Sequence, residues 1–402
     1  MSRIRLWAAA LAVTVAAPAT AQRTIDAVVQ RNRLVIRDLR LAALVTRPGC
    51  PHVIEQAFPL AGPEQTRWRI CWRITSNSEG RSSQLVIGPV SFRKVPSAQF
   101  MKVFHDARVA EIHVPYFSGS PRYFDITHFS FAMETLTAGE CPASAGATLV
   151  GPNVCVERRD RGVAWRDGAA QNAQRGEEVV IWGALDAANY SYIQSYAFRD
   201  DGIIVGRVGA TGQNLGGSME PHVHNAVWRL DIDLGGLANT VEVQRHVETM
   251  GGNSTGSTNV STVTTAGKFD WTPQSFTTLG ITRDGLANAR GRATSYHLTP
   301  IIESGLSRHS EAFTQADFWV TPYNAGFQTA ADLPSYIAGA PPVQNRDLMV
   351  WFKNSALHHP RTEDGVTVNG QWIGTTHAMW SGFMMMPHDL FDCAPLYQQT
   401  CP

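Results

Sequence analysis

The stretch Trp68-Arg69-Ile70-Cys71-Trp72-Arg73-Ile74 is the strongest indicator of the fold class, because apolar and polar side chains alternate along it. Alternate side chains of an extended strand share a face, so this period of two predicts a half-buried β-strand. Residues 192–198 and 203–205 predict two more strands, joined by Asp200-Asp201-Gly202. Asp-Gly favours a tight hairpin turn. Strands are also expected over residues 223–234 and 348–352.

Helical periodicity is weak outside residues 6–17 and 24–44. The chain has 402 residues, of which 44% are hydrophobic, so it can bury a large core. All-β units of this length often form one domain rather than two. We therefore expect an all-β fold, a large antiparallel β-sandwich with long excursions. Residues 251–267, rich in Gly, Ser, Thr and Asn, are expected to form an exposed loop or hairpin tip.

The first 21 residues have the features of a secretory signal peptide. Arg3 and Arg5 precede a short apolar run, and Ala19-Thr20-Ala21 has the small-x-small pattern of a cleavage site. No later stretch offers the roughly 20 consecutive apolar residues that a membrane helix needs. We expect a soluble protein that is exported to the periplasm or the extracellular space. Its parts would be a signal peptide (1–21), an N-terminal extension (22–65) and one β-sandwich domain (66–402).

Six cysteines also suit an oxidising compartment, and they fall into three couples that are local in the sequence. We interpret them as the disulfides Cys50–Cys71, Cys141–Cys155 and Cys393–Cys401. A thiolate metal site is the alternative, although the sequence contains no Cys-x-x-Cys pair.

The charges of the chain balance, since Lys plus Arg equals Asp plus Glu at 34 each. No net charge therefore attracts the chain to nucleic acid or to an anionic membrane. A small-molecule partner suits this balance better.

Histidines in two separate segments indicate a metal centre. His222-Val223-His224 lies in a predicted strand, so its two imidazoles share a face while Val223 points away. A third histidine could come from the run His358-His359-Pro360-Arg361-Thr362-Glu363-Asp364. Imidazole suits copper or zinc, and three ligands leave coordination positions open for water, oxygen or substrate. The sequence therefore predicts a metal centre that performs chemistry rather than one that only stabilises the fold.

With Asn189-Tyr190-Ser191-Tyr192 added, these motifs resemble the copper amine oxidases, specifically their catalytic β-sandwich domain, over residues 66–397. In that family an Asn-Tyr-Asp/Glu-Tyr motif holds the tyrosine that becomes topaquinone. A His-x-His strand gives two copper ligands, and a His-x-Pro-Arg-x-Glu-Asp motif gives the third. The resemblance implies copper bound by His222, His224 and His358, with His359 as the alternative third ligand. It also implies a topaquinone formed from Tyr190.

Further segments resemble the same family, namely Ala110-Glu111-Ile112-His113-Val114-Pro115-Tyr116, Tyr123-Phe124-Asp125 and Trp319-Val320-Thr321-Pro322-Tyr323-Asn324. The resemblance makes Asp125 the catalytic base and Tyr116 the residue that hydrogen-bonds the cofactor oxygen. Tyr123 would be the gate of the substrate channel, and Asn189 would keep the cofactor ring in its productive orientation. Without the family, a strand tyrosine would be interpreted as packed core with a satisfied hydroxyl. The pair Cys141–Cys155 falls where the family's catalytic domain carries a disulfide.

A second metal site is implied by acidic residues in two segments, Asp231-Ile232-Asp233 and Asp347-Leu348. Carboxylates and backbone carbonyl oxygens suit a hard cation such as calcium. The resemblance places a peripheral calcium at these residue types. The alternative is that they are acidic residues on solvated strand faces.

The activity implied by the resemblance is that of a secreted copper and topaquinone amine oxidase. It would convert a primary amine, either a small molecule or a peptide amine, together with O2 and water into an aldehyde, ammonia and hydrogen peroxide. Two departures stand out. Ser191 replaces the family's acidic residue, and the segment between Gly212 and His222 is too short for the arm that embraces a partner subunit, which weakens the expectation of a homodimer.

Two other functions fit parts of the sequence. One is a secreted copper-binding homologue without activity, in which Tyr190 stays unmodified. The other is a zinc hydrolase with Asp125 or Glu363 as its base, although the sequence has no His-Glu-x-x-His motif.

Overall fold

The computed structural model describes residues 50–392, except for 60–63, 79, 96, 98, 169–171, 215–218, 250–254, 272–274 and 303–306. The expected signal peptide (1–21), the segment with helical periodicity (24–44) and the pair Cys393–Cys401 lie outside the described residues. The other two predicted disulfides, Cys50–Cys71 and Cys141–Cys155, are confirmed.

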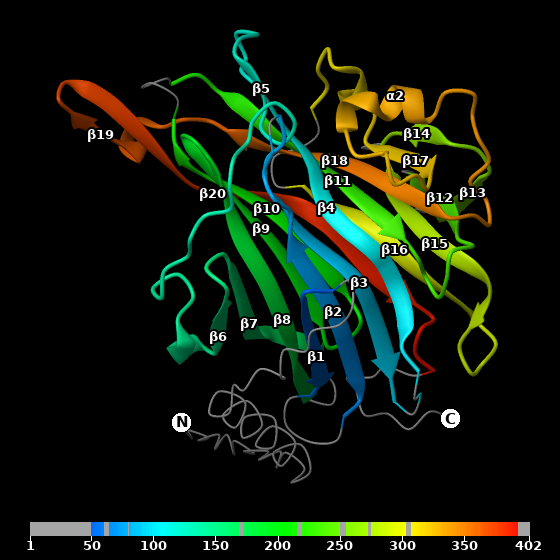
Figure 1. Cartoon of the computed structure of the whole chain (residues 1–402). Helices are drawn as coiled ribbons and strands as arrows, with labels where there is room; N and C mark the ends of the chain where they lie inside the picture. The colour runs from blue at the N-terminus through cyan, green and yellow to red at the C-terminus, as the bar shows by residue number, and fades with distance from the viewer. Residues whose placement is uncertain are drawn as a thin grey trace, which may run out of the picture.

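Two antiparallel sheets make up this part of the chain (Figure 1). The first sheet has the order β1 (His52–Phe58), β2 (Thr66–Ile74), β3 (Leu85–Lys94), β4 (Met101–Pro115), β11 (His222–Ile232), β18 (Leu348–His358), β17 (Phe318–Pro322) and β14 (Gly267–Phe269), and β5 (Arg122–Phe124) pairs with β4. The second has the order β13 (Thr255–Val263), β12 (Thr240–Thr249), β15 (Ser275–Ala287), β16 (Ala293–Ile302), β20 (Gln371–His388), β10 (Ile204–Gln213), β9 (Tyr190–Arg199), β8 (Asn172–Ala187), β7 (Val154–Asp167) and β6 (Ala147–Val150), and β19 (Gly365–Val368) pairs with β20. The all-β antiparallel fold class is confirmed.

Helices are short in the described ranges. They are α2 (Leu333–Tyr336) and the 3₁₀ turns η1 (Ala143–Ala145), η3 (Ala312–Thr314), η4 (Ala330–Asp332) and η5 (Thr362–Asp364). None of the helices in this part of the chain has the length and apolar character that crossing a membrane requires.

The strand predictions hold in position and differ in length. Residues 68–74 lie in β2, and the Asp-Gly turn joins β9 to β10, where Phe198 pairs with Ile204. β11 ends at Ile232, two residues before the predicted end, whereas β18 continues to His358. Within residues 251–267, β13 pairs along its length with β12, so the hairpin expected there is longer than a tip.

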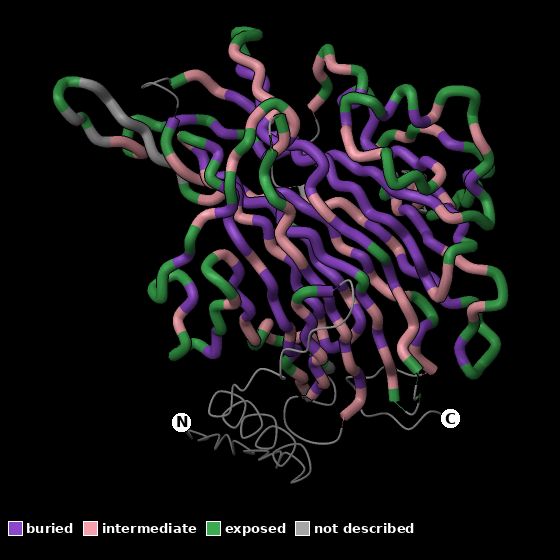
Figure 2. Tube along the Cα trace, viewed as in Figure 1, coloured by how far each residue is buried: buried purple, intermediate pink, exposed green. Residues whose placement is uncertain are grey.

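The core lies between the sheets and appears in Figure 2 as the buried stretches of the central strands. Trp228 of β11 contacts two rings of the second sheet, Tyr196 at 5.8 Å and Phe383 at 5.0 Å between centroids. The other face of β11 is covered as well, since Val227 packs in a second cluster with Phe313. All of β11 is therefore buried. Because His222 and His224 share the face of Trp228, they point into the space between the sheets.

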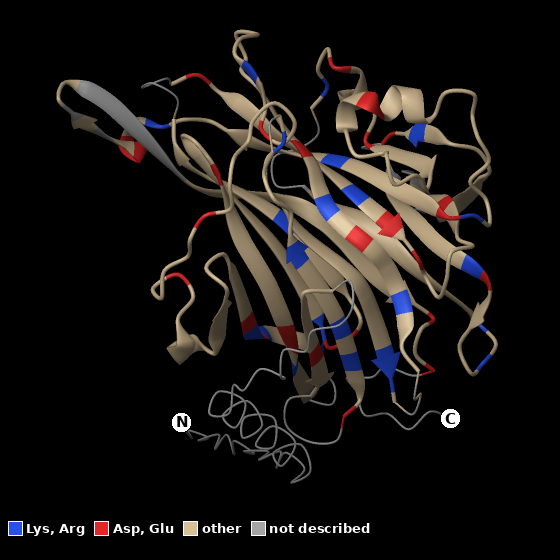
Figure 3. Cartoon of the chain, viewed as in Figure 1, with Lys and Arg blue, Asp and Glu red and all other residues tan. Residues whose placement is uncertain are grey.

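Buried charges lie on the outer face of the first sheet, where Figure 3 shows basic and acidic residues adjoining on β4 and β11. Asp106 accepts hydrogen bonds from Arg73 at 2.7 Å, Arg108 at 3.0 Å and Arg229 at 2.9 Å. Burial raises the pKa of Asp106, but the three guanidinium groups outweigh it and hold this pKa below its usual range. This network links β2, β4 and β11 on the face away from the histidines.

Candidate metal centre and active site

The three histidines predicted as ligands come together at one end of the sandwich. His222 and His224 begin β11, and His358 ends the neighbouring strand β18, where it pairs directly with His222. One nitrogen from each ring lies within 4.8 Å of the others, and all three residues are buried. The alternative third ligand, His359, is exposed and is not part of this cluster. The geometry therefore selects His358.

The surroundings of the imidazoles leave lone pairs directed at this centre. Nδ1 of His222 lies 3.0 Å from the carbonyl oxygen of Glu220 and must donate to it, so Nε2 is left as an acceptor. Nδ1 of His224 lies 3.1 Å from the Tyr192 hydroxyl, and its Nε2 is buried without a hydrogen-bond partner in the described structure. Burial lowers the pKa of His222, lowers that of His224 well below its usual range, and lowers that of His358 to about 4. Neutral imidazoles are the form that binds metal.

Tyr190 faces the histidines from the opposite sheet. Its hydroxyl lies 2.9 Å from Nε2 of His222, 2.6 Å from Nδ1 of His358 and 3.2 Å from Oδ1 of Asn214. The residue is only 5% exposed. Burial, with a contribution from Tyr116, raises the pKa of Tyr190 above its usual range. The predicted cofactor precursor thus lies within hydrogen-bond distance of two of the predicted ligands.

A glycine makes room for the backbone at Tyr190. Gly212 of β10 pairs with Tyr190 and has a φ of +130°. A Cβ at this position would lie 2.5 Å from the carbonyl oxygen of Asn189 and 2.9 Å from Cα of Tyr190. Glycine is therefore required by both the conformation and the close approach. The Asn189 side chain donates to the carbonyl oxygen of Gln213 at 2.9 Å and so fixes the turn in front of Tyr190.

Asp125 and Tyr190 share a cavity of about 170 Å³. Its lining is Val114, Tyr116, Tyr123, Asp125, Phe129, Phe131, Ala187, Ala188, Asn189, Tyr190 and Tyr192. Burial raises the pKa of Asp125 to about 7, opposed by the hydrogen bond that the Tyr192 hydroxyl donates to it at 2.6 Å. A carboxyl group with such a pKa can exchange protons near neutral pH. All the residues predicted for catalysis, Asp125, Tyr116, Tyr123, Asn189 and Tyr190, line this one cavity.

The peptide segment that carries Asp125 is held by buried groups. Ser82 donates its hydroxyl to the carbonyl oxygen of Asp125 at 2.6 Å. Oε1 of Glu111 accepts hydrogen bonds from the N–H groups of Ile112 and Ile126, at 2.9 and 3.0 Å. Burial raises the pKa of Glu111 to about 7. Asp125 is thus positioned by contacts on both sides of its backbone.

Aromatic rings connect the histidines with the cavity. The Tyr116 ring stacks on His222 with centroids 4.3 Å apart and an interplanar angle of 14°. Tyr123 meets Tyr116 at 6.3 Å and Phe129 at 6.2 Å. Burial raises the pKa of Tyr116 to about 12, so its hydroxyl stays protonated at neutral pH. Tyr123 is half-buried, as a residue between the cavity and its mouth would be.

Ser191, the first departure from the motif, points to the opposite face of β9 from Tyr190. Its hydroxyl donates to Oε1 of Glu134 at 2.5 Å. A carboxylate therefore lies beside this position although the strand itself does not supply one. The substitution leaves the lining of the Tyr190 cavity unchanged, since Ser191 does not contribute to that lining.

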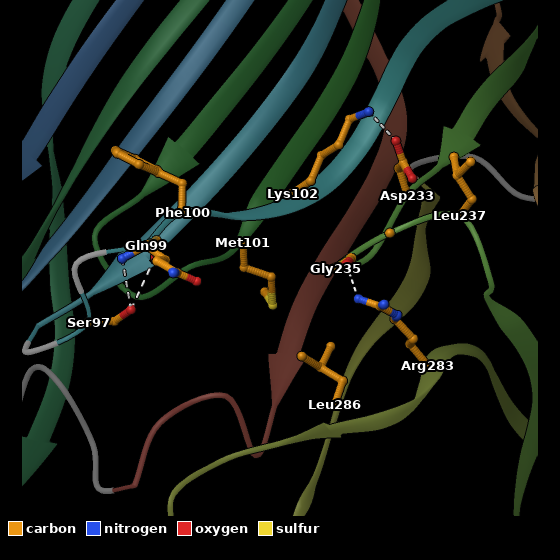
Figure 4. A pocket seen from close by; sticks show the side chains of 11 residues that line it. Ser97, Gln99, Phe100, Met101, Lys102, Asp233, Gly235, Leu237, Arg283 and Leu286 are labelled. Atoms are coloured by element: carbon orange, nitrogen blue, oxygen red, sulfur yellow. Dashed lines mark hydrogen bonds and ion pairs between the residues drawn. The ribbon is translucent and has the colours of Figure 1, made fainter.

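The residues of the predicted calcium site also lie near one another, but with a lysine among them. Asp231 and Asp233 are buried and so do not lie on a solvated strand face, whereas Asp347 is half-buried. Burial raises the pKa of Asp231 to about 7, with Asp347 and Asp233 contributing. Lys102 of β4 forms an ion pair with Asp233 at the edge of a second cavity, of about 610 Å³ (Figure 4). A cation site here would include a carboxylate that already has a cationic partner.

Several residues of the site were not predicted. Tyr192 stands in the quoted motif, and its period-two relation to Tyr190 was a signal that could have placed it on the same face. Glu111 likewise stands in a quoted segment, but only the fold shows what it holds. No sequence pattern indicated Asn214, which contacts Tyr190, or Lys102, which pairs with Asp233. Both contacts depend on how the strands assemble into sheets.

Fold and site together define a two-sheet β-sandwich with a buried three-histidine cluster suited to a metal, and with a tyrosine and a carboxyl group beside it. Residues 213–400 match the sequence model of the copper amine oxidase enzyme domain. This range contains all three histidines and begins after Tyr190. The chain is a remote relative of the copper amine oxidases, and its residues 213–400 are similar to their enzyme domain.

Individual amine oxidases from other organisms are also similar to this chain in sequence. Over 331 residues the chain is 24% identical to diamine oxidase [copper-containing] 1, peroxisomal, of Nicotiana tabacum, covering 69% of this chain and 39% of that protein. It is 23% identical to copper amine oxidase 1 of Aspergillus niger (68% and 52% covered) and 24% identical to histamine oxidase of Arthrobacter globiformis (73% and 51% covered). The chain thus spans about half or less of the length of these relatives.

Solved structures share the fold. The copper-containing benzylamine oxidase from Hansenula polymorpha superimposes with a TM-score of 0.63 at 17% identity, covering 89% of this chain and 64% of that one. The Aspergillus nidulans amine oxidase gives a TM-score of 0.64, also at 17% identity, with 83% and 52% covered.

Proposed function

We propose that this protein is a copper and topaquinone amine oxidase. It would convert a primary amine, O2 and water into an aldehyde, ammonia and hydrogen peroxide. The observation that carries the proposal is the position of the Tyr190 hydroxyl, 2.9 Å from His222 and 2.6 Å from His358, with Asp125 on the same cavity. A tyrosine buried against three neutral histidines is well placed for oxidation by a bound redox metal.

The residues around Tyr190 suit both copper and the quinone that this function needs. Neutral imidazoles with free lone pairs suit copper, and we assign His222, His224 and His358 as its ligands. Bound copper would supply the redox chemistry that turns the Tyr190 ring into a quinone with O2, and the quinone would supply the electrophile that a primary amine attacks. The open cavity along Tyr190 gives the amine access to that ring.

Asp125 is the proposed base for the substrate. Its pKa of about 7 lets a carboxylate remove the proton from the substrate carbon that bears the nitrogen, and the same group can return a proton later. The Tyr192 hydroxyl holds this carboxyl group in place at 2.6 Å. We assign Tyr116 to hydrogen bonding with the cofactor oxygen, Tyr123 to the gate and Asn189 to the orientation of the ring. The cavity walls limit the access of water to the reacting atoms.

The segments outside the site complete the proposal. We propose that residues 1–21 are a signal peptide for export, that 22–65 form an extension, and that 66–402 form the enzyme domain. The extension contributes β1, which pairs with β2 at the edge of the first sheet. The disulfides Cys50–Cys71 and Cys141–Cys155 suit a protein that works in an oxidising compartment.

The test is a visible spectrum of metal-free protein before and after aerobic addition of Cu²⁺, followed by phenylhydrazine. We expect a broad quinone band that shifts with phenylhydrazine and is absent from Tyr190→Phe, while this variant still binds copper. Copper binding without a band in the parent protein would instead identify a copper-binding homologue with an unmodified Tyr190. Failure to bind copper would refute both the amine oxidase and the copper-binding homologue. A preference for zinc would instead favour the zinc hydrolase considered from the sequence.

A further inference from the structure

The outer part of the Tyr190 cavity is walled by aromatic rings. Phe129 and Phe131 stack with centroids 4.7 Å apart and an interplanar angle of 17°, and Tyr123 lies 6.2 Å from Phe129. These three residues are half-buried, whereas Tyr190 and Asp125 at the inner end are buried. A molecule that enters therefore passes along apolar ring surfaces before it reaches the carboxyl group.

The size of the cavity limits what it can hold. Its volume is about 170 Å³. An apolar cavity of about 150 Å³ is large enough to bind benzene. One six-membered ring therefore fits, whereas a long aliphatic chain would extend beyond the walls.

The charge of the lining is equally restrictive. Asp125 is the one Asp, Glu, Lys, Arg or His among the described lining residues. A second ammonium group on the ligand would lose water without gaining a partner, which is unfavourable. Asp186, near the end of β8, does not line the cavity, and its Oδ1 accepts the backbone N–H of Ala188 at 3.0 Å.

The aromatic wall is fixed by hydrogen bonds to the neighbouring segment. The N–H of Phe131 donates to the Ser82 hydroxyl at 3.1 Å, and the N–H of Ser83 donates to the carbonyl oxygen of Phe131 at 2.8 Å. The Ser130 hydroxyl donates to the carbonyl oxygen of Ser78 at 2.5 Å. The rings are therefore held in place before any ligand binds, and a preformed pocket favours ligands that match its shape.

We propose that this cavity selects primary amines with one aromatic ring and a single positive charge, such as benzylamine and 2-phenylethylamine, over aliphatic diamines. The ammonium end pairs with Asp125, and the ring packs against Phe129 and Phe131. The step from ligand to substrate rests on the proposed amine oxidase function.

Binding is measured by calorimetry on the full, copper-loaded chain carrying Tyr190→Phe, so that no reaction with a quinone contributes heat. We expect benzylamine to bind at least tenfold more tightly than putrescine, the factor that corresponds to about 1.4 kcal/mol. Phe129→Ala is expected to weaken benzylamine binding roughly tenfold, since aromatic contacts of this kind contribute on that scale. Phe276→Ala, which removes a 71% exposed ring elsewhere, is the matched control and leaves binding unchanged.

A second variant tests the charge argument by a gain rather than a loss. Phe129→Asp places a carboxylate at the outer wall and is expected to improve putrescine binding while it weakens benzylamine binding. Equal or tighter binding of putrescine by the parent cavity, or no response to either Phe129 substitution, would overturn the inference.

Turnover of the unmodified chain separates this inference from the proposed function. A quinone band with oxidation of putrescine in preference to benzylamine would overturn the inference alone. Selective benzylamine binding without any quinone would reject the oxidase and still support the selectivity of the cavity.

Discussion

Two opposing effects act on the carboxyl group of Asp125. Burial raises its pKa, and the hydrogen bond from Tyr192 lowers it, with a net value of about 7. In the unfolded chain this pKa is 3.8, so the folded state holds its proton more tightly. The folded protein is therefore favoured below the unfolded pKa, and stability falls as the pH rises from about 4 to about 7.

Asp125→Asn removes this dependence. We expect the variant to lose amine oxidation and to become more stable than the parent above pH 7, by about 4 kcal/mol at the most, since each pKa unit corresponds to about 1.4 kcal/mol. Below pH 4 the advantage disappears. Urea unfolding at pH 4 and pH 8 measures the difference, and an advantage that is the same at both pH values would contradict it.

Tyr192→Phe removes the one interaction that lowers the pKa of Asp125. The acid limb of the pH profile of kcat/KM should then move to higher pH, because the carboxylate forms only at higher pH. The comparison is made at equal copper content, since Tyr192 also contacts His224. Ser195→Ala, on the other face of the same strand, serves as the control. An acid limb that stays in place would show that Asp125 does not govern it.

At the scale of strands, the pairing of β11 with β18 determines the site. His222 and His358 are partners in the ladder, so their spacing follows from the register of the two strands. A slip by one residue would move every side chain of the slipped strand to the other face. The same strands carry Asp231 and Leu348 at their opposite ends, and Asp233 follows β11 directly, so one pairing organises both predicted metal sites.

The ion pair between Lys102 of β4 and Asp233 yields a prediction about calcium. In copper-free protein, chelators should leave the unfolding temperature of the parent unchanged, because the ammonium group of Lys102 already pairs with Asp233. Lys102→Met should lose roughly 1–2 kcal/mol, less than for a fully buried pair because the lysine side chain is 33% exposed. Millimolar Ca²⁺ should restore the variant and not affect the parent, as measured by thermal unfolding.

Lys268→Met, which removes an exposed lysine on β14, is the control for this substitution. A parent protein that gains stability from Ca²⁺ would show that the ion displaces the lysine.

The features that could be predicted from the sequence are those that depend on residues close together in the chain. The period-two pattern placed His222 and His224 on one face, and the order of the motifs brought in His358 and Tyr190. The pattern could not give the pairing of β11 with β4, which has register shifts, or the approach of Lys102 to Asp233. The end of β18 was also missed, because the strand continues through the polar run Lys353-Asn354-Ser355, which is nonetheless buried.

For the whole molecule, the sheets rather than the loops hold the site. β11 and β18 belong to one sheet and β9 to the other, and the hydrogen bonds of Tyr190 cross between them. A ligand that binds this centre therefore stabilises the packing of the entire sandwich. Any ion that binds the folded state and not the unfolded chain raises the free energy of unfolding by mass action.

Copper is accordingly expected to raise the unfolding temperature. At a free concentration of about 100 times Kd the gain would be about 2.7 kcal/mol, which corresponds to a shift of a few degrees. His224→Ala should remove most of this gain, whereas His246→Ala, on β12 of the second sheet and outside the histidine cluster, should retain it. Differential scanning calorimetry with and without Cu²⁺ measures both. An equal shift of the unfolding temperature in the parent, His224→Ala and His246→Ala would show that copper binds outside the histidine cluster.

The site residues lie far apart along the chain, and this separation determines the order in which folding, metal binding and modification of Tyr190 can occur. His222 and His358 are 136 residues apart, and Tyr190 and His358 are 168 apart. No short fragment of the chain contains the centre, so a growing or translocating chain offers His222 and His224 long before it offers His358. If the proposed function holds, the metal would bind after the strands have paired and the sheets have stacked, and modification of Tyr190 would follow metal binding. Maturation of Tyr190 would therefore be the last step, and the colour of the mature protein would report that folding is complete.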